Sequence, residues 1–163
     1  MNSRRQIAIL CPDLSSNALG RAIVLHELCG RFADAFIMGP VGSKGLWPPA
    51  RDLRIDIRPF DAHGAWAGGP KRVEQLAREF DVDLLYASKP LPLSFGVALT
   101  WRQVGGVPVA VDIDDWERAL YSGLPLHRRI WHEHRFNPLA AVKKMEARIG
   151  EADAVTVVST FLQ

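Results

Sequence analysis

The sequence predicts an α/β protein built on a doubly wound, mostly parallel sheet of about six strands, with helices on both faces. Two observations carry this prediction. Short and nearly continuous apolar runs recur along the chain, as in strands that are buried on both faces. Amphipathic stretches with helical spacing lie between these runs. Strands that alternate with helices in this way indicate a Rossmann-like fold.

The expected strands are rich in Val, Ile, Leu and Ala. In chain order they are 7–11, 35–38, 53–57, 84–87, 107–113 and 154–158. The third is the weakest, because its apolar residues alternate with polar ones instead of forming a continuous run.

Four apolar stripes with helical spacing predict the helices between these strands. The stripes are Ala22, Leu25, Cys29 and Phe32; Val73, Leu76, Ala77 and Phe80; Leu93, Val97, Trp101 and Val104; and Val142, Met145, Ile149 and Ala152. Stretches 39–49 and 61–70 are rich in Gly and Pro and are expected to be loops. Residues 117–138 are expected to form a longer insertion before the last helix.

Composition sets the broad class of the protein. The chain has 163 residues, of which 48% are hydrophobic, enough for one compact domain with a substantial core. Its formal net charge is only +2, so no nucleic-acid partner is expected. The apolar run 7–11 is too short for a signal peptide, no run is long enough to span a membrane, and the two cysteines suit a reducing compartment. We therefore expect a cytoplasmic protein.

Ligands of open parallel sheets bind beyond the carboxyl ends of the strands, which directs attention to the residues that follow each predicted strand. The candidates for substrate binding at these places are Asn17, Gly20, Arg21, Lys89, Asp112 and Ser159. The small residues and the Asn before the first helix could bind an anion through backbone N–H groups, or they could simply cap the helix. Neither GxGxxG nor GxxxxGK[ST] is present, so no nucleotide cofactor is expected from motifs.

The acidic run after the fifth strand is the most distinctive chemical feature of the chain. In a strand, Asp112 and Asp114 would lie on one face and Asp115 on the other. Clustered carboxylates repel one another unless a cation, hydroxyl donors or a shared proton offsets their charge. We expect Asp114 and Asp115 to be catalytic; the alternative is that one of them caps the helix that follows.

Two features of the C-terminal third bear on metal binding and on membrane contact. The histidines between 127 and 134 do not have the HExxH spacing, so no metal site is expected. Residues 118–148 contain seven basic and two acidic side chains with apolar residues between them. This composition suits peripheral contact with an anionic membrane at the inner face, or equally a solvated face that covers apolar surface with long side chains.

Several segments together resemble the N-terminal domain of a GT-B fold glycosyltransferase of the group 1, family 4 type. They are the strand and loop 7–21, the strand entry 81–86, the strand 106–111 with its following acidic residues, and the helix, strand and Ser of 147–159. Many members of that family place His-Asp after the fifth strand, where this chain has Asp114-Asp115. The chain also stops just after a strand, where Ser159 or Thr160 could cap a new helix.

The resemblance implies that residues 1–163 form the acceptor-side domain of a longer two-domain transferase. A nucleotide-sugar donor would bind mainly to a C-terminal domain that this chain lacks, and a sugar or lipid-linked acceptor would bind to this one. The fragment alone would then be inactive, because half of the cleft cannot orient both substrates.

Two alternatives from other classes remain open at this point. Residues 109–114 also resemble the first motif of haloacid-dehalogenase-type phosphatases, in which Asp112 would attack phosphorus, Asp114 would act as acid or base, and Mg²⁺ would offset the charge. A binding module without catalytic activity fits as well, since a fold does not fix a function.

Overall fold

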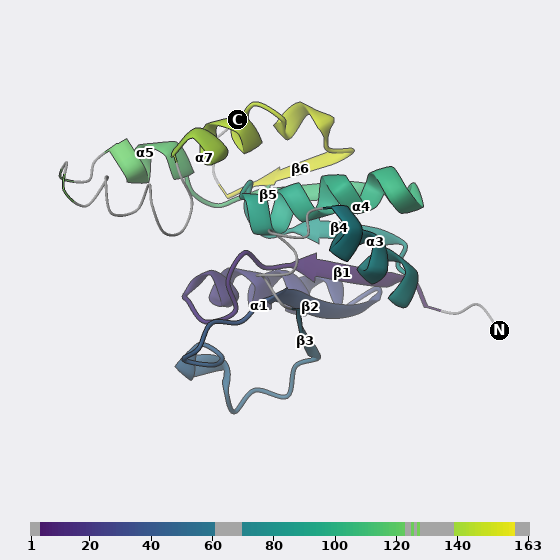
Figure 1. Ribbon diagram of the computed structural model, residues 1–163. Coiled ribbons are helices and arrows are strands. Elements are labelled where there is room, and N and C mark those ends of the chain that lie inside the picture. The colour runs from purple at the N-terminus through teal and green to yellow at the C-terminus, as the bar shows by residue number, and fades with distance from the viewer. Residues whose placement is uncertain (1–3, 61–69, 123–124, 126, 128–138, 159–163) are drawn as a thin grey trace.

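The computed structural model describes residues 4–60, 70–122, 125, 127 and 139–158, and its centre is one parallel β-sheet (Figure 1). The strands are β1 (Gln6–Leu10), β2 (Asp34–Pro40), β3 (Ile57–Phe60), β4 (Leu84–Ala87), β5 (Val109–Ile113) and β6 (Ala154–Val157). Their spatial order is β3-β2-β1-β4-β5-β6, and every neighbouring pair is parallel. This order confirms the predicted Rossmann-like α/β fold.

Helices and short helical turns connect the strands. The longer helices are α1 (Ala18–Cys29), α3 (Pro70–Glu79), α4 (Val97–Gly105), α5 (Glu117–Ser122) and α7 (Leu139–Glu146). A π-helical turn at Pro92–Gly96 leads into α4, and 3₁₀ turns occupy Pro48–Ala50 and Ile149–Glu151. Gly106 caps the C-terminus of α4: its φ is 67°, a left-handed conformation that glycine adopts readily, and its N–H donates to the Arg102 carbonyl.

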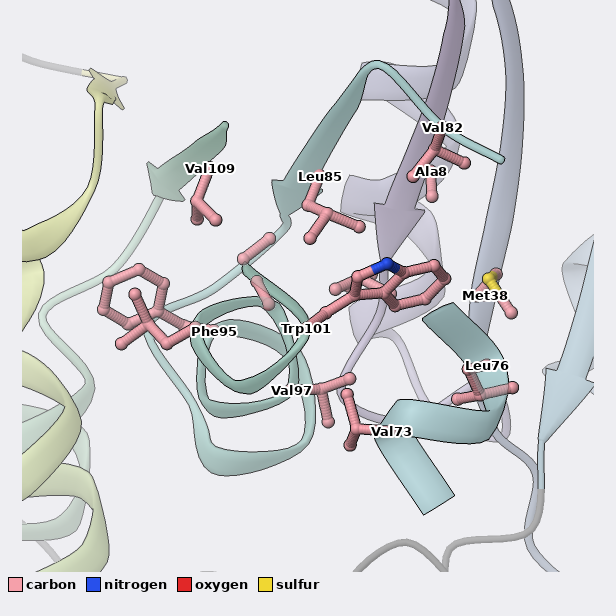
Figure 2. Packing of buried hydrophobic residues seen from close by; sticks show 14 of the residues in the cluster. Ala8, Met38, Val73, Leu76, Val82, Leu85, Phe95, Val97, Trp101 and Val109 are labelled. Atoms are coloured by element: carbon pink, nitrogen blue, oxygen red, sulfur yellow. The ribbon is translucent and has the colours of Figure 1, made fainter. Parts of the chain in front are cut away.

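Two apolar clusters cover the two faces of the sheet. On one face α1 and the segment after β2 pack on alternate residues of β1, including Ile7 and Ile9. On the other face α3 and α4 pack on the intervening residues, including Ala8 and Leu10. Figure 2 shows the ring of Trp101 reaching from α4 toward Met38 and Leu76 in this second cluster. Helices therefore lie on both faces, as predicted.

Glycine is required at one position in β2. A Cβ atom at Gly39 would lie 2.4 Å from the carbonyl oxygen of Cys11, at the end of β1. The two strand ends are held together there, because the Cys11 N–H also donates to the Met38 carbonyl at 2.7 Å. The β1 and β2 ends can approach this closely only without a side chain at position 39.

Four predicted boundaries differ from the structure. The expected strand 53–57 is displaced, because β3 begins only at Ile57; Ile55 packs beside the α1-side cluster without joining the ladder. Phe32, expected on the buried helical face, lies after the end of α1 and is 68% exposed. The last helical stripe is divided, since α7 ends at Glu146 and a 3₁₀ turn follows. The expected loop 39–49 begins inside β2.

Candidate functional site

The sheet order places the topological switch point, where the order of strands along the sheet reverses, between β1 and β4. To one side of this point the chain runs from β1 to β2 and β3, and to the other from β4 to β5 and β6. Open α/β sheets bind ligands beyond the carboxyl ends of their strands at such a point. The candidate site therefore lies at the ends of β1, β4 and β5, which carry most of the predicted residues.

Arg21 and Asp112 form a bidentate ion pair across this edge. The Arg21 Nε and Nη2 atoms donate to Asp112 at 2.7 and 2.9 Å. Asp112 lies on β5 and is fully buried, whereas Arg21 projects from the first turn of α1 and is 25% exposed. Hydrogen bonding to Asp112 raises the pKa of Arg21 further above its ordinary value. The pair links the helix after β1 to a strand two places away in the sheet.

Two hydroxyl groups extend this ion pair into a chain of hydrogen bonds. Thr156 of β6 donates its hydroxyl proton to Asp112 at 2.7 Å, so its oxygen accepts the Tyr86 O–H at 2.8 Å. Tyr86 comes from β4, so the chain crosses three adjacent strands. Burial raises the pKa of Tyr86, which keeps its phenol protonated as this arrangement needs.

Lys89, after β4, is shared by three carboxylates. Its Nζ lies 2.8 Å from Asp114, 3.2 Å from Asp115 and 2.7 Å from Glu117. Burial opposes the charge of Lys89, but its bonds to Asp114 and Glu117 outweigh this and raise its pKa. Burial of Glu117 raises the pKa of that carboxyl, with Lys89 only partly compensating. The cluster therefore contains one cation for three acids.

The same three acids have the arrangement of a cation site. One oxygen from each of Asp114, Asp115 and Glu117 lies within 4.8 Å of the others. The Lys89 ammonium contacts all three, so it takes the position that a metal ion would need. The donor set as it stands therefore fits a resident ammonium better than a divalent cation.

The loop between β1 and α1 satisfies its own polar groups. Asp13 accepts the N–H of Ser15 at 2.8 Å, and the Ser16 hydroxyl accepts the N–H of Ala18 at 3.3 Å. Asn17 precedes the helix without a capping bond from its side chain. Within the described residues, the glycines with positive φ are Gly45 and Gly106, so this loop lacks the left-handed glycine turn of phosphate-binding loops.

The segment after β2 packs against the start of α1. The Trp47 N–H donates to the Leu14 carbonyl at 2.9 Å, and the Gly42 N–H donates to the Ser15 hydroxyl at 2.6 Å. A Cβ atom at Gly20 would lie 3.2 Å from the Trp47 ring. Close contact with the tryptophan is thus a structural reason for a glycine at this position that needs no ligand.

Cys11 directly follows β1 at the same edge but is poorly suited to nucleophilic chemistry. It is fully buried, and this burial raises the pKa of its thiol to about 12. Thiolates are the reactive form of cysteine, so this thiol is inert at neutral pH.

The structure brings the predicted residues into two groups and adds three more. Asp112 faces Arg21, whereas Asp114 and Asp115 both face Lys89, because the strand ends at Ile113 and the chain then turns. Strand alternation predicted that Asp115 would lie on the face opposite to Asp114. This prediction is wrong, because both carboxylates contact Lys89. Their catalytic and binding roles remain predictions.

Sequence reasoning missed Glu117, Tyr86 and Thr156. Glu117 continues the acidic run, which is a usable signal, but Thr156 is recognised only from the pairing of Asp112 with it across β5 and β6. Ser159 and most of the His-rich and basic segment, namely 123–124, 126 and 128–138, lie outside the described residues. No helix among those described is long and apolar enough to cross a membrane.

The sheet order and its helical layers define the class of the fold as Rossmann-like, and comparison with known proteins gives a particular neighbour. No family model matches the chain, and no curated protein matches it. A solved structure from Veillonella parvula DSM 2008, a short-chain dehydrogenase/reductase (wide type) in complex with NADP, matches with a TM-score of 0.50. The match covers 94% of this chain and 68% of that one at 10% identity. At this identity the likeness shows the Rossmann-like fold alone.

These findings correct the predicted function. The prediction of a GT-B glycosyltransferase with a nucleotide-sugar donor and a sugar or lipid-linked acceptor is wrong, since the neighbour is an NADP-bound dehydrogenase/reductase. The phosphatase and non-catalytic alternatives gain no support either. For the phosphatase there is also a physical reason: the proposed nucleophile Asp112 is fully buried, and both its oxygens accept hydrogen bonds from Arg21.

Proposed function

We propose that the protein is the ligand-binding Rossmann-like domain of an enzyme, and that Asp114 and Asp115 bind adjacent hydroxyl groups of a hydroxyl-rich ligand. The ribose of a nucleoside is the simplest ligand of this class. The observation that carries the proposal is the position of Lys89, which holds both carboxylates side by side beyond the end of β5.

The free oxygens of these carboxylates support binding of a diol. Lys89 contacts Oδ1 of Asp114 and Oδ2 of Asp115, and in the described part of the chain the other oxygen of each makes no hydrogen bond. Asp115 is 52% exposed, so a ligand can reach it from solvent. Ionised carboxylates only accept hydrogen bonds, so they suit hydroxyl donors, and acidic side chains bind ribose hydroxyls in related folds.

The charge of the edge favours such a ligand over a phosphate. Arg21 is matched by Asp112, and Lys89 faces three carboxylates, so this part of the edge has an excess of negative charge. A neutral polyol gains hydrogen bonds there without repulsion, whereas a phosphate would meet like charge.

Packing on the β1–β2 side supports a ligand position on the β4–β5 side of the edge. On the β1–β2 side, Trp47 and Gly42 already bond to the loop after β1. A ligand that enters near Lys89 and Asp115 avoids these contacts.

A pair of nucleosides that differ by one hydroxyl tests the proposal. We expect adenosine to bind about ten-fold or more tightly than 2′-deoxyadenosine, the value of one hydrogen bond to a charged group. Calorimetry and ligand-observed NMR would measure this, and a panel of other ribonucleosides with their 2′-deoxy forms extends it to other bases.

Two matched variants locate the binding. Asp115→Asn should remove the preference for the ribonucleoside, whereas Asp81→Asn, an exposed acid before β4 at the opposite edge of the sheet, should leave it intact. Equal binding of the two sugars throughout the panel, or an equal effect of both variants, would contradict the proposal.

Structural likeness favours a second candidate, an NADP-dependent oxidoreductase. The neighbouring structure is in complex with NADP, and the match to it covers 94% of the present chain. On this hypothesis the dinucleotide phosphates would have to draw Arg21 away from Asp112. Binding of NADPH, followed by its fluorescence and lost on Arg21→Gln, would favour this candidate over the first.

A further inference from the structure

Arg21 lies where an anionic ligand would be expected in this fold. It stands in the first turn of α1, directly after the β1 loop, and a quarter of its side chain is exposed. A guanidinium group at the start of a helix is well suited to a phosphate, because its N–H groups can bind two oxygens at once.

Asp112 occupies this phosphate-binding geometry from inside the protein. It accepts from both Nε and Nη2 of Arg21, the two donors that a bidentate anion would use. Thr156 donates to the same carboxylate and Tyr86 donates to Thr156, so the acid is held in place from β6 and β4. The buried carboxylate thus takes the place that a bound anion would take on Arg21.

Lys89, another cation at this edge, is committed in the same way. Its ammonium contacts Asp114, Asp115 and Glu117 within 3.2 Å. A phosphate that approached either cation would have to displace a carboxylate. That carboxylate is part of the protein and cannot diffuse away. Carboxylates of the protein itself therefore engage both of these cations.

We infer that Asp112 is a specificity-determining residue that excludes phosphorylated ligands by holding Arg21, so that the site selects uncharged hydroxyl-rich molecules. This inference rests on the proposed diol-binding function and goes beyond it, since it names the ligand class that the site rejects and the residue responsible.

The charge of Asp112, more than its shape, carries this exclusion. Asparagine has the same size and keeps one oxygen that can accept from Arg21 and Thr156, but it has no negative charge. Asp112→Asn should therefore turn the edge into a weak anion site. A purely structural role predicts only a loss of stability.

Inorganic pyrophosphate is the probe for this test, with binding measured by calorimetry on folded protein. Wild-type protein should bind it negligibly, and Asp112→Asn should bind it about ten-fold more tightly or better, since removal of one repelling charge next to a cation is worth at least that factor. The double variant Arg21→Gln/Asp112→Asn should lose the gain. A folded Asp112→Asn variant without increased affinity would overturn the inference.

A measurement on the wild-type protein covers the case in which Asp112→Asn does not fold. The ¹⁵Nε–¹H resonance of Arg21 should stay unchanged as pyrophosphate is added, because Asp112 keeps the guanidinium. A saturable shift of that resonance would overturn the inference. The nucleoside experiment is independent: if adenosine fails to bind while Asp112→Asn gains pyrophosphate, the diol proposal fails and the exclusion stands.

Discussion

Two groups of ion pairs lie beyond the carboxyl ends of the strands, one around Arg21 and one around Lys89. They differ in how completely the positive charge offsets the negative charge. Arg21 faces one carboxylate, Asp112, which is fully buried and has a third donor in Thr156. Lys89 faces three carboxylates, one of which is half exposed. A matched, buried pair can fix the ends of the strands, whereas an unmatched, exposed group keeps acceptors for a ligand. In the proposed function, stability and binding are thus assigned to different side chains.

The largest expected effect comes from breaking the matched pair. Arg21→Met leaves the buried Asp112 with only its Thr156 donor, and an uncompensated buried charge costs about 3–5 kcal/mol. Urea unfolding would measure this loss. Arg4→Met is the control, since Arg4 and Asp34 form an exposed pair worth at most about 1 kcal/mol. Equal losses in the two variants would show that burial of Asp112 is not important.

Removal of Lys89 should have a smaller effect that depends on pH. Lys89→Met leaves three carboxylates in mutual repulsion, which we expect to cost about 2 kcal/mol at neutral pH, because the more exposed acids can turn toward water. The cost should shrink in acid as the carboxylates take up protons. A loss that stays constant between pH 7 and pH 4 would mean that packing of the lysine stem, and not charge, is responsible.

The hydrogen bonds from Tyr86 to Thr156 and from Thr156 to Asp112 should contribute still less to the free energy of unfolding. Thr156→Val removes the donor to Asp112 and keeps the shape of the side chain, with an expected loss of about 1–2 kcal/mol in the free energy of unfolding. Tyr86→Phe should cost less, because Thr156 still donates to Asp112 without it. The reverse order would contradict the direction assigned to these hydrogen bonds.

The smallest effect concerns Glu117 and is visible only as a trend with pH. Burial raises the pKa of Glu117 above its ordinary value of 4.5, so the folded protein keeps a proton that the unfolded chain has released. Its contribution to the free energy of unfolding is therefore greatest below that value and falls as the pH rises through the raised pKa. The stability of wild type relative to Glu117→Gln should decline over this range, and an increase would show that Lys89 dominates.

The sequence was sufficient for the fold where each strand is a continuous apolar run. Strands β1, β2, β4, β5 and β6 all begin within two residues of their predicted starts. Strand β3 was misplaced, because alternation at 53–57 reports packing of one face and says nothing of ladder pairing, which begins at Ile57. The prediction that Phe32 lies on the buried face of a helix was wrong, because the helical spacing of apolar residues continues in the sequence beyond Cys29, where α1 ends.

The candidate site was predictable only in part, for a related reason. The rule that parallel strands end at one edge located Arg21, Lys89 and the acidic run. Which cation meets which acid depends on the turn after Ile113 and on the register of β5 with β6, and a single sequence specifies neither. The prediction of function was wrong for a different reason. Weakly specific motifs that are common to many Rossmann-like proteins were interpreted as those of one family.

Gly39 limits how this protein could be re-engineered. In the loop after β1, Asp13, Ser15, Ser16 and Asn17 reach solvent and can be varied in a library to seek new ligands, whereas Leu14 is fully buried. Position 39 cannot join that library: even alanine would press its methyl group into the carbonyl of Cys11 and separate the strand ends that support the loop. Substitutions that change the specificity of this edge must therefore leave the close contact between Gly39 and the Cys11 carbonyl unchanged.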